Sequence, residues 1–594
     1  MCGIAAVFAY QSGSPNPTRE ELLNIRDSMI ERGPDDAGIW CSPDGCVGLA
    51  HRRLAIIDLS PSGAQPMATA EDTSRIVFNG EIYNYRQLRQ SLEAKGYQFQ
   101  SNSDTEVLLR LYEERGEEMV HLLRGMYAFA IWDNVKKGLF VARDPFGIKP
   151  LYYSDDGSTL RLASQVKALL AGGQVETEPD PAGKVGFLLW GHVPEPFTMY
   201  KRIRVLPAGV RMWVAAGGKP KIFRFFDVSE ELRNAEQTQL SLTEEHMREH
   251  LRVALLDSLR HHLVADVPVG LFLSAGLDST TLAGLTREIS DTPLKTITLG
   301  FMEYSDGIHN EVPLAEKVAQ HYGTNHTTEW ITKTAFDEEY PRLLAAMDQP
   351  SIDGVNTYFV SKAAAENGLK VALSGLGGDE LFGGYPSFKQ IPLITKRLAP
   401  LKVLPGLGTA FRYISADLLR RFTSSKYAGL LEYGTSYGGA YLLRRGLFMP
   451  WELPEVLDAA IVREGWAELS TLSRLDETVA GIRRDHFKIC ALETAWYMRN
   501  QLLRDADWAS MAHSLEIRVP LVDVELFRIV ARLFTSTTTP SKRAMAQTPR
   551  LALPQEILER TKSGFSVPVR EWSSTPGSRH RGLRDWALRL SNRV

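Results

Sequence analysis

The chain has 594 residues, of which 44% are hydrophobic and 23% charged, so it has the composition of a globular protein but is too long for one hydrophobic core. Its net charge of -3 gives no basis for nucleic-acid binding, and no apolar run is long enough to cross a membrane. Four scattered cysteines and the lack of a signal-peptide pattern predict a reduced, cytoplasmic protein.

The first domain is expected to span residues 2–210. Apolar alternation, interrupted by Gly, Asp and Pro, predicts short strands in this part of the chain. Helical periodicity is present at 18–31 and 104–115. The mixture predicts an α+β domain of stacked sheets with a few helices. Its clearest predicted strands are 76–85, 127–133 and 138–144.

A second domain is expected at 241–594, after a polar segment at 211–240 that we interpret as a linker. A helix predicted at 244–263 is followed by buried strands that alternate with helices, which is typical of a parallel α/β sheet. After residue 395 the chain is mostly helical, most clearly at 482–513. The predicted strands are 267–274, 294–301 and 368–375, and the predicted helices between them are 279–289 and 358–367.

The chain begins MCGIAAVFAY, which places a cysteine at the second position. If Met1 is removed, the α-amine of Cys2, with a reference pKa of roughly 7.7–8, can accept the proton of its own thiol. One residue would then supply both the nucleophile and the base. The alternative is that Cys2 is a small apolar residue at the start of a strand, and its position alone favours that interpretation.

Two further motifs could complete a site around Cys2. FNGEIYN (78–84) places Asn79 and Gly80 in a tight turn, where an amide side chain and a backbone N–H could stabilise an oxyanion. SNSDTE (101–106) places Asp104 at a predicted helix N-cap. Taken singly, each motif is also explained by an ordinary turn or cap.

Taken together, the motifs of residues 2–170 resemble the class II glutamine amidotransferase domain. The resemblance implies an N-terminal-nucleophile fold of two stacked antiparallel sheets, in which Cys2 attacks the side-chain amide of glutamine and releases ammonia. It also implies that Asn79 and Gly80 form the oxyanion hole. The motifs, in chain order, are Cys2, RGPDD (32–36), HRRL (51–54), NGEIYN (79–84), SNSDTE (101–106), GMYAFAIWD (125–133) and ARDPFGIKPLYY (142–153).

The same resemblance assigns the residues that hold glutamine. Arg53 and Asp104 bind its α-carboxylate and α-amine, and Glu81 helps to orient it. An arginine and an aspartate match the two charges of a free amino acid. One departure from the family pattern is Gln165, which stands where an acid is usual.

Two glycine-rich segments follow predicted strands of the second domain. LSAGLDSTT (273–281) opens a helix, where small residues let backbone N–H groups approach an anion, although an ordinary strand–turn–helix junction is an equal alternative. LSGLGGDELFGGY (373–385) has the same form. Asp278 and Asp379 therefore end loops at the carboxyl edge of a parallel sheet, where ligands bind. Two aspartates beside a triphosphate require a divalent cation, so the pattern predicts Mg2+ bound by this pair.

A lysine far along the chain, Lys562 in ERTKSGFSVP (559–568), could neutralise phosphate charge. With RDADWASMAHSLEIRVPLVD (504–523), these segments resemble the PP-loop ATP pyrophosphatase domain of asparagine synthetases over residues 240–575. The resemblance implies that ATP adenylates a carboxylate, which ammonia then attacks. It also implies that Lys562 and Arg518 are cations at this site. The residues implied to bind ATP, pyrophosphate or Mg2+ are Ser274, Gly276, Asp278, Ser279, Leu299, Ser374, Gly375 and Asp379.

The acceptor carboxylate is the least determined part of the prediction. Leu376 stands where asparagine synthetases usually carry an acid, and Ala275 where a glycine is common. Aspartate is the leading acceptor; a sugar uronate, a cell-envelope precursor or a secondary metabolite is the alternative. DQPSIDGVNTYF (348–359), with Asp348, Asp353 and Asn356, is either part of the acceptor pocket or a structural loop.

The resemblance also implies an apolar ammonia tunnel between the two sites, with GMYAF (125–129) as a candidate for its wall. The predicted partners are the small molecules glutamine, ATP and the acceptor, and a homodimer is left open. A catalytically silent protein that binds glutamine or nucleotide is an alternative of another class.

Overall fold

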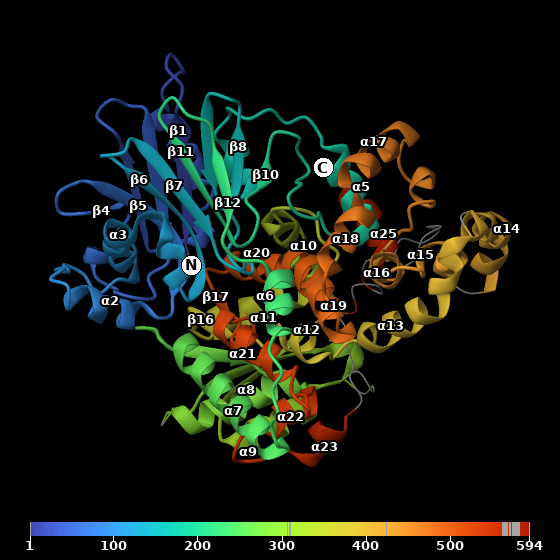
Figure 1. The fold of residues 1–594 in the computed structure, drawn as a ribbon. Helices are drawn as coiled ribbons and strands as arrows, with labels where there is room; N and C mark the ends of the chain where they lie inside the picture. The colour runs from blue at the N-terminus through green and yellow to red at the C-terminus, as the bar shows by residue number, and fades with distance from the viewer. Residues whose placement is uncertain are drawn as a thin grey trace.

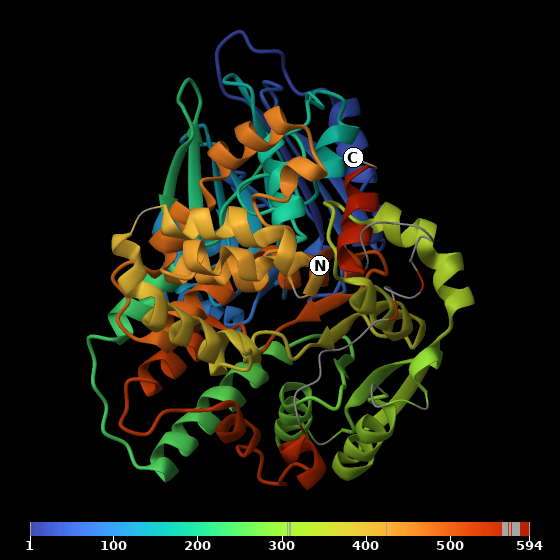
Figure 2. The same cartoon turned by 90° about the vertical axis from the view of Figure 1, so that its right-hand side faces the viewer.

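The computed structural model describes residues 2–290, 292–305, 307, 310–404, 406–422, 424–560, 568, 572 and 582–592. Two six-stranded antiparallel sheets form the N-terminal part, and a five-stranded parallel sheet forms the centre of the C-terminal part. In both Figure 1 and Figure 2 the two N-terminal sheets lie above the parallel-sheet part. Both predicted fold classes are therefore confirmed.

The strands of the N-terminal sheets come from residues spread over the first 224 positions. The first sheet has the order β10-β8-β9-β1-β3-β2 and the second has the order β12-β11-β7-β6-β5-β4. The bounds are β1 Gly3–Ala9, β2 Asp36–Cys41, β3 Val47–Arg53, β4 Met67–Ala68, β5 Ser74–Ile82, β6 Gly125–Asp133, β7 Gly138–Arg143, β8 Tyr152–Asp155, β9 Thr159–Ala163, β10 Arg204–Val205, β11 Val210–Ala215 and β12 Lys221–Arg224.

Alternation along the strands explains why the sheets stack. In β1, Ile4, Ala6 and Phe8 point into the core between the two sheets, whereas Ala5 and Val7 face the opposite side. Because successive side chains of a strand point to opposite faces, β1 needs apolar residues at every position. Its outer face is covered by α1 (Arg19–Asp27) and α4 (Val166–Ala171), and the second sheet is covered by α2 (Tyr85–Glu93) and α3 (Asp104–Arg115).

The segment 211–240, expected to be a linker, is largely regular structure. Strands β11 and β12 pair with each other, and β11 pairs with β7, so they extend the second sheet. Helix α6 (Val228–Ala235) follows and packs against the C-terminal part. The polar composition was misleading because β12 is an edge strand whose four residues are all exposed. Only short stretches around α6 connect the two parts.

The parallel sheet has the order β15-β14-β13-β16-β17. The predicted strands correspond to β13 (Val269–Phe272), β14 (Lys295–Phe301) and β16 (Val371–Leu373). Strands β15 (Asn325–Ile331) and β17 (Glu516–Arg518) were not predicted, because β15 is a half-exposed edge strand and β17 has only three residues. The helices around the sheet are α7 Glu244–His262, α8 Leu277–Ile289, α9 Val312–Tyr322, α10 Lys333–Ala346 and α11 Val355–Glu366.

Helices dominate the rest of the chain, as predicted, and the segment 482–513 is three consecutive helical stretches. Its middle stretch, η8 (Glu493–Leu503), is π-helical, a form often found at functional sites. No helix of the described ranges is long and apolar enough to cross a membrane. The helices are α5 Pro181–Trp190, α12 Gly378–Phe382, α13 Ser387–Leu398, α14 Leu407–Phe422, α15 Leu430–Tyr433, α16 Tyr437–Arg445, α17 Ala459–Leu469, α18 Thr471–Val479, α19 Asp485–Leu492, α20 Arg504–Met511, α21 Val524–Leu533, α22 Lys542–Ala546, α23 Gln555–Glu559 and α25 Leu583–Ser591.

A buried ion pair holds the N- and C-terminal parts together. The guanidinium of Arg124 donates to both carboxylate oxygens of Asp523 at 2.8 Å, and it also donates to Asp257 at 2.7 Å. Met126 and Phe146 of the N-terminal part lie in one apolar cluster with Val519 of the C-terminal part. The junction is therefore fixed by both charge and packing, and it places the two sites of the chain relative to each other.

Candidate active sites

Cys2 lies at the start of β1 with its backbone held by Asn79. The N–H of Cys2 donates to Asn79 Oδ1 at 2.9 Å, and both residues are buried. The other side-chain atom of Asn79, Nδ2, is buried and has no hydrogen-bond partner among the described residues. An unpaired buried amide donor is costly unless a ligand accepts from it. Asn79 therefore has the contacts expected of an oxyanion-hole donor beside a cysteine nucleophile.

Gly80 is required by the close approach of β5 and β6. Its φ is +151°, and a Cβ at this position would lie 2.0 Å from the carbonyl oxygen of Met126. No side chain fits against that backbone. Contrary to the expected tight turn, Asn79 and Gly80 lie inside strand β5, because their neighbours pair with β6 without interruption.

The protonation state of Cys2 depends on its neighbours. Burial raises the pKa of the thiol, and the negative charge of Glu81 raises it further. The backbone N–H of Leu54 and the guanidinium of Arg53 act in the opposite direction. A buried thiol with a raised pKa needs a base close to it, which is what a free α-amine on the same residue would supply.

The residues expected to hold glutamine are buried in the same part of the chain. Arg53 donates to the backbone carbonyls of Ser60, at 2.9 Å, and Asp58. Asp104 accepts from the N–H of Ile82 at 3.0 Å, and burial raises the pKa of its carboxyl to about 6. A buried arginine and a buried aspartate are therefore both present, as expected for a site that recognises an amino acid.

The predicted N-cap at Asp104 is wrong by one residue. Helix α3 is capped by Ser103, which has an extended backbone and accepts from the N–H of Thr105. Asp104 is the first residue of the helix. Because Ser103 satisfies the helix end, the carboxylate of Asp104 is available for other contacts.

Arg518 was expected among the cations of the ATP site, but its side chain is turned away from the pocket described below. Its guanidinium is fully buried, pairs with Glu516 at 2.6 Å and lies 3.3 Å from Glu81. It also donates to the carbonyls of His262 and Val264. Its neighbour Ile517 lines the pocket described below, and alternation along β17 turns Arg518 to the other face. The side chain of Arg518 therefore lies beside Glu81, one of the residues expected to hold glutamine.

Arg32, in the RGPDD segment, has a role that the sequence analysis did not find. Its Nε donates to the backbone carbonyl of Cys2 at 3.1 Å. Its two terminal nitrogens donate to both oxygens of Asp507 on α20, at 2.7 and 3.0 Å, and the pair is buried. A bidentate pair of this kind fixes orientation as well as charge. It connects the backbone of Cys2 directly to the C-terminal part.

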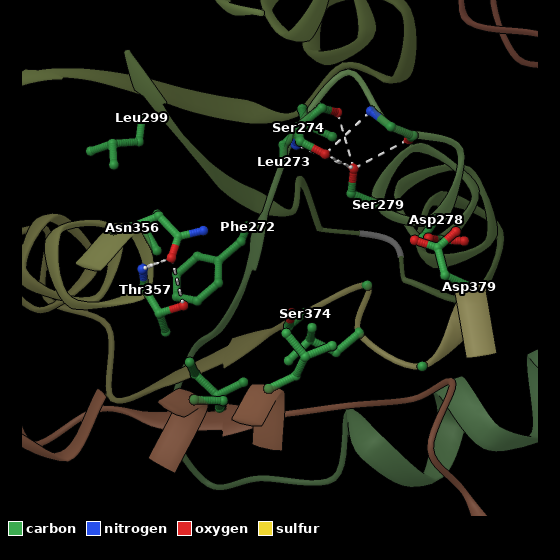
Figure 3. Close-up of a pocket in the computed structure, with 18 of the residues that line it drawn as sticks. Phe272, Leu273, Ser274, Asp278, Ser279, Leu299, Asn356, Thr357, Ser374 and Asp379 are labelled. Atoms are coloured by element: carbon green, nitrogen blue, oxygen red, sulfur yellow. Dashed lines mark hydrogen bonds between the residues drawn. The ribbon is translucent and has the colours of Figure 1, made fainter. Parts of the chain in front are cut away.

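A pocket with a volume of about 300 Å³ opens at the carboxyl end of the parallel sheet, as predicted. Figure 3 shows Asp278 and Asp379 close together on one side of it and Leu299 on the opposite side. Every residue expected to bind ATP or Mg2+ lines it except Arg518, and Lys562 lies outside the described residues. The lining residues used below are Ser274, Gly276, Asp278, Ser279, Leu299, Asn356, Ser374, Gly375, Leu376, Asp379, Glu380 and Tyr385.

The loop after β13 is shaped for an anion. Ser279 Oγ lies 2.9 Å from Ser274 Oγ and accepts from the Ser274 N–H at 3.2 Å, which closes the loop on itself. Helix α8 begins directly after Gly276, and no side chain caps it. Its first backbone N–H groups therefore need acceptors, and an anion such as a phosphate would supply them.

The second glycine-rich loop packs directly against the first. A Cβ at Gly375 would lie 2.9 Å from the Cβ of Asp278, and a Cβ at Gly378 would lie 2.3 Å from Asp278 Oδ1. Glycine at both positions lets the two loops approach closely. The distance in sequence between the loops is large, but their glycines place both aspartates in one pocket.

Lys542, on α22, was not identified from the sequence. Its Nζ donates to Asp278 Oδ2 at 2.8 Å and to Asp379 Oδ1, so one ammonium joins the two predicted metal ligands. Asp278 Oδ1 is buried and has no hydrogen-bond partner within the described ranges. Hard oxygen donors of this kind fit Mg2+. In the sequence, the segment SKRAMA (541–546) shows only a pair of basic residues of the kind that is common on protein surfaces, so it does not indicate a binding site.

Leu376, Glu380 and Tyr385 also line the pocket. Burial raises the pKa of Glu380 to about 7, and the hydroxyl of Tyr385 donates to its carboxylate at 2.8 Å. Leu376 packs against the neighbouring apolar cluster. The segment 348–359 was expected to be either part of the acceptor pocket or a structural loop, and its residue Asn356 lines the pocket. Asp348 instead accepts from the N–H groups of residues 166 and 167, both at 3.0 Å.

Asp348 thereby caps the helix that begins after the unusual Gln165. Gln165 is at the N-cap of α4 but makes no side-chain capping bond. The carboxylate of Asp348, from the C-terminal part, satisfies the first N–H groups of that helix instead. An interdomain contact therefore replaces a local cap at this position.

Two family models match the chain: "Glutamine amidotransferase domain" over residues 1–225 and "Asparagine synthase" over residues 250–592. The chain is 33% identical over 582 residues to glutamine-hydrolyzing asparagine synthetase 1 of Bacillus subtilis, covering 96% of this chain and 88% of that protein. It is 32% identical over 412 residues to glutamine-hydrolyzing asparagine synthetase B of Escherichia coli, covering 66% of each. It is also 30% identical over 424 residues to an amidase of Gibberella zeae, and the match covers 66% of this chain and 60% of that protein.

Proposed function

Because the chain belongs to the asparagine synthase family, we propose that it is a ligase that takes ammonia from glutamine and joins it to a carboxylate activated by ATP. One observation carries the proposal: the same chain holds Cys2 against the unpaired amide of Asn79 and a pocket between two glycine-rich loops with paired aspartates. The first site can release ammonia and the second can consume it.

In the first site, removal of Met1 exposes the α-amine of Cys2, which accepts the thiol proton. The sulfur attacks the side-chain carbonyl carbon of glutamine, and Asn79 Nδ2 and the Gly80 N–H stabilise the oxyanion. The carbon–nitrogen bond then breaks, ammonia leaves with the transferred proton, and water hydrolyses the thioester to glutamate. Asp104 and Glu81 bind the ammonium group of glutamine, and Arg53 binds its carboxylate.

In the second site, the serine loop and the start of α8 hold the phosphates of ATP. An oxygen of the acceptor carboxylate attacks the α-phosphorus, pyrophosphate leaves, and an acyl adenylate forms. Ammonia attacks the acyl carbon and AMP leaves, which gives an amide. Mg2+, bound by Asp278 and Asp379, would neutralise phosphate charge, and Lys542 and Lys562 add positive charge.

Ammonia must pass between the sites without becoming protonated. Met126 and Ile148 of the N-terminal part and Leu271 and Ala506 of the C-terminal part belong to one buried apolar cluster. An apolar surrounding favours neutral ammonia over ammonium. This cluster supports a direct passage, with Met126 from the predicted GMYAF wall as one of its members.

We propose aspartate as the acceptor, because Glu380, which lines the pocket, can pair with an α-ammonium group. Burial holds its pKa at about 7, and binding of a cation would favour the ionised form. Leu376 favours a second candidate, a carboxylate with an apolar body, since it presents a methyl-lined wall where a charge is usual.

The test is a balance of substrates and products. Purified protein with Mg2+, ATP, glutamine and aspartate should give asparagine, AMP, pyrophosphate and glutamate in equal amounts. Cys2→Ala should lose the glutamine-supported reaction and keep the reaction supported by ammonia. Glutamine hydrolysis without asparagine or AMP would refute aspartate, and an acceptor screen with ammonia would then decide between another carboxylate and a silent binding protein.

A further inference from the structure

A second polar cavity, with a volume of about 470 Å³, lies where β12 and α6 meet α18 and η8. It is separate from both proposed sites and shares no lining residue with the nucleotide pocket. Four arginines face it, from both parts of the chain. The lining residues that carry the argument are Glu195, Arg224, Arg233, Arg474, Trp496 and Arg499.

Two of these arginines have no acidic partner. Arg474 donates to the backbone carbonyl of Glu195 at 2.6 Å, and Arg499 donates to the backbone carbonyl of Phe146 at 3.2 Å. Neither forms an ion pair with any carboxylate in the described part of the chain. Each guanidinium has five N–H donors, so most of their hydrogen-bonding capacity is unused. Arg233 is similar, since it donates to the carbonyl of Ala480.

The carboxylates around the cavity do not cancel this charge. Glu195 is already paired with Arg143, at 2.7 Å. Asp227 lies 3.4 Å from Arg224 and also caps α6. The other two acids that line the cavity, at positions 230 and 477, are exposed to solvent. The interior of the cavity therefore keeps an excess of positive charge.

The electrostatics of Arg499 agree with the geometry. Burial lowers the pKa of its guanidinium, and the nearby positive charges of Arg143 and Arg224 lower it further, although Glu195 opposes them. Burial also lowers the pKa of Arg474, although the negative charges of Glu195 and Glu477 oppose this effect. Like charges that lie close together in a partly buried cavity are unfavourable unless an anion joins them. An anion in the cavity would relieve this repulsion.

We propose that this cavity binds a small metabolite that presents oxyanion groups, phosphate or carboxylate, to Arg474, Arg499 and Arg233. Guanidinium groups pair with both kinds of oxyanion through two parallel hydrogen bonds. The volume is within the range of small-molecule sites. Trp496, whose ring lies 5.2 Å from the Arg474 guanidinium, provides an apolar wall for the rest of the ligand.

The occupant would join the two parts of the molecule. Arg224 ends β12 of the N-terminal sheet, whereas Arg474 and Arg499 belong to the C-terminal helices. Arg499 also holds the carbonyl of Phe146, in the ARDPFGIKPLYY segment. A ligand that binds only the assembled form stabilises that form. The cavity is thus an effector site at the junction of the N- and C-terminal parts of the chain.

Inorganic phosphate and citrate are the probes, because one is a phosphate and the other a polycarboxylate. Each is titrated into the purified full chain by calorimetry, with ionic strength held constant. Saturable binding of either probe is expected, and it should fall about tenfold or more in Arg474→Gln and in Arg499→Gln. Arg202→Gln, an exposed arginine paired only with Glu176, is the matched control and should bind normally.

The outcomes distinguish the ligand class and can overturn the proposal. Binding of phosphate alone assigns a phosphate ester, and binding of citrate alone assigns a polycarboxylate. Because Arg499 supports Phe146, Arg233→Gln is the milder variant if Arg499→Gln unfolds. Absence of binding by both probes would overturn the proposal. Binding that is unchanged in all three variants, Arg474→Gln, Arg499→Gln and Arg233→Gln, would also overturn it. Displacement of the probe by α,β-methylene ATP would overturn it as well, because the probe would then lie in the nucleotide pocket.

Discussion

Arg518→Met is the substitution that separates the two roles considered for Arg518. The sequence resemblance places it at the ATP site, whereas the structure places its guanidinium 3.3 Å from Glu81 and 2.6 Å from Glu516. Methionine keeps the length of the side chain and removes its charge and all of its donors. The carbonyls of His262 and Val264 would also lose their donor.

The expected magnitude follows from those contacts. Removing one partner of a buried ion pair costs about 3–5 kcal/mol of stability. This cost arises at Glu516, whose carboxylate would be left buried without its partner. Burial opposes the ionisation of Glu516, but the surrounding positive charges, including Arg518, lower its pKa to about 2. Burial and Glu516 raise the pKa of Glu81, and Arg518 opposes them. Without Arg518, the ionised form of Glu81 becomes still less favourable, and weakening of its charge-assisted bond to glutamine would cost about 1.5–3 kcal/mol or ten- to a hundredfold in kcat/KM.

The assay compares the two nitrogen sources. Arg518→Met should lower kcat/KM for glutamine ten- to a hundredfold or so, while the KM for ATP with saturating ammonia stays unchanged. Arg518→Lys, which keeps the charge, should recover part of the glutamine activity, and Arg202→Met is the surface control. An increase in the KM for ATP with unchanged use of glutamine would refute the reasoning and return Arg518 to the ATP site.

Three further substitutions test separate contacts. Because burial raises the pKa of Asp104 from 3.8 to about 6, wild type loses stability as the pH rises from about 4 to 6. The free energy of unfolding of Asp104→Asn, measured in urea, should therefore exceed that of wild type by up to about 3 kcal/mol at pH 7.5 and should equal it at pH 4. The same variant should lose glutamine hydrolysis. Lys542→Met leaves Asp278 and Asp379 without their shared ammonium, so pyrophosphate release should fall about a hundredfold while glutamine hydrolysis continues. Asp348→Ala should lower the free energy of unfolding by about 1–2 kcal/mol through the lost cap of α4, with no change in acceptor KM.

Each of these has a result that would contradict it. Equal stability of Asp104→Asn and wild type at both pH values would mean that Asp104 is not strained by burial. Unchanged pyrophosphate release in Lys542→Met would remove Lys542 from the nucleotide site. A raised acceptor KM in Asp348→Ala would restore the interpretation of Asp348 as a pocket residue.

Local sequence was sufficient wherever one segment holds all the determinants of its structure. LSAGLDSTT joins an apolar strand to a helix through small residues, and the structure has β13, the loop and α8 in that order. Helix α3 has the predicted bounds. The cap of α3 was displaced by one residue because Ser103 and Asp104 are both good capping residues, and only the backbone conformation decides between them.

Long-range pairing could not be predicted in the same way. Lys542 reaches Asp278 across 264 positions, and Arg32 reaches Asp507 across 475. Isolated basic residues of this kind are usually solvated, and although Arg32 begins the RGPDD motif, nothing nearby in sequence indicates the partner of either residue. Strand β12 was missed because an exposed edge strand has no apolar alternation to find.

The sequence by itself determined the two chemistries, because Cys2, Asn79 and the two glycine-rich loops belong to short motifs that can be identified without the structure. Tertiary structure alone decided how the chemistries are joined. Alternation along β17 turns Ile517 toward the nucleotide pocket and Arg518 toward Glu81, so one short strand serves both sites. The direction of a side chain on a buried strand depends on register against its neighbours, and register is a property of the assembled sheet.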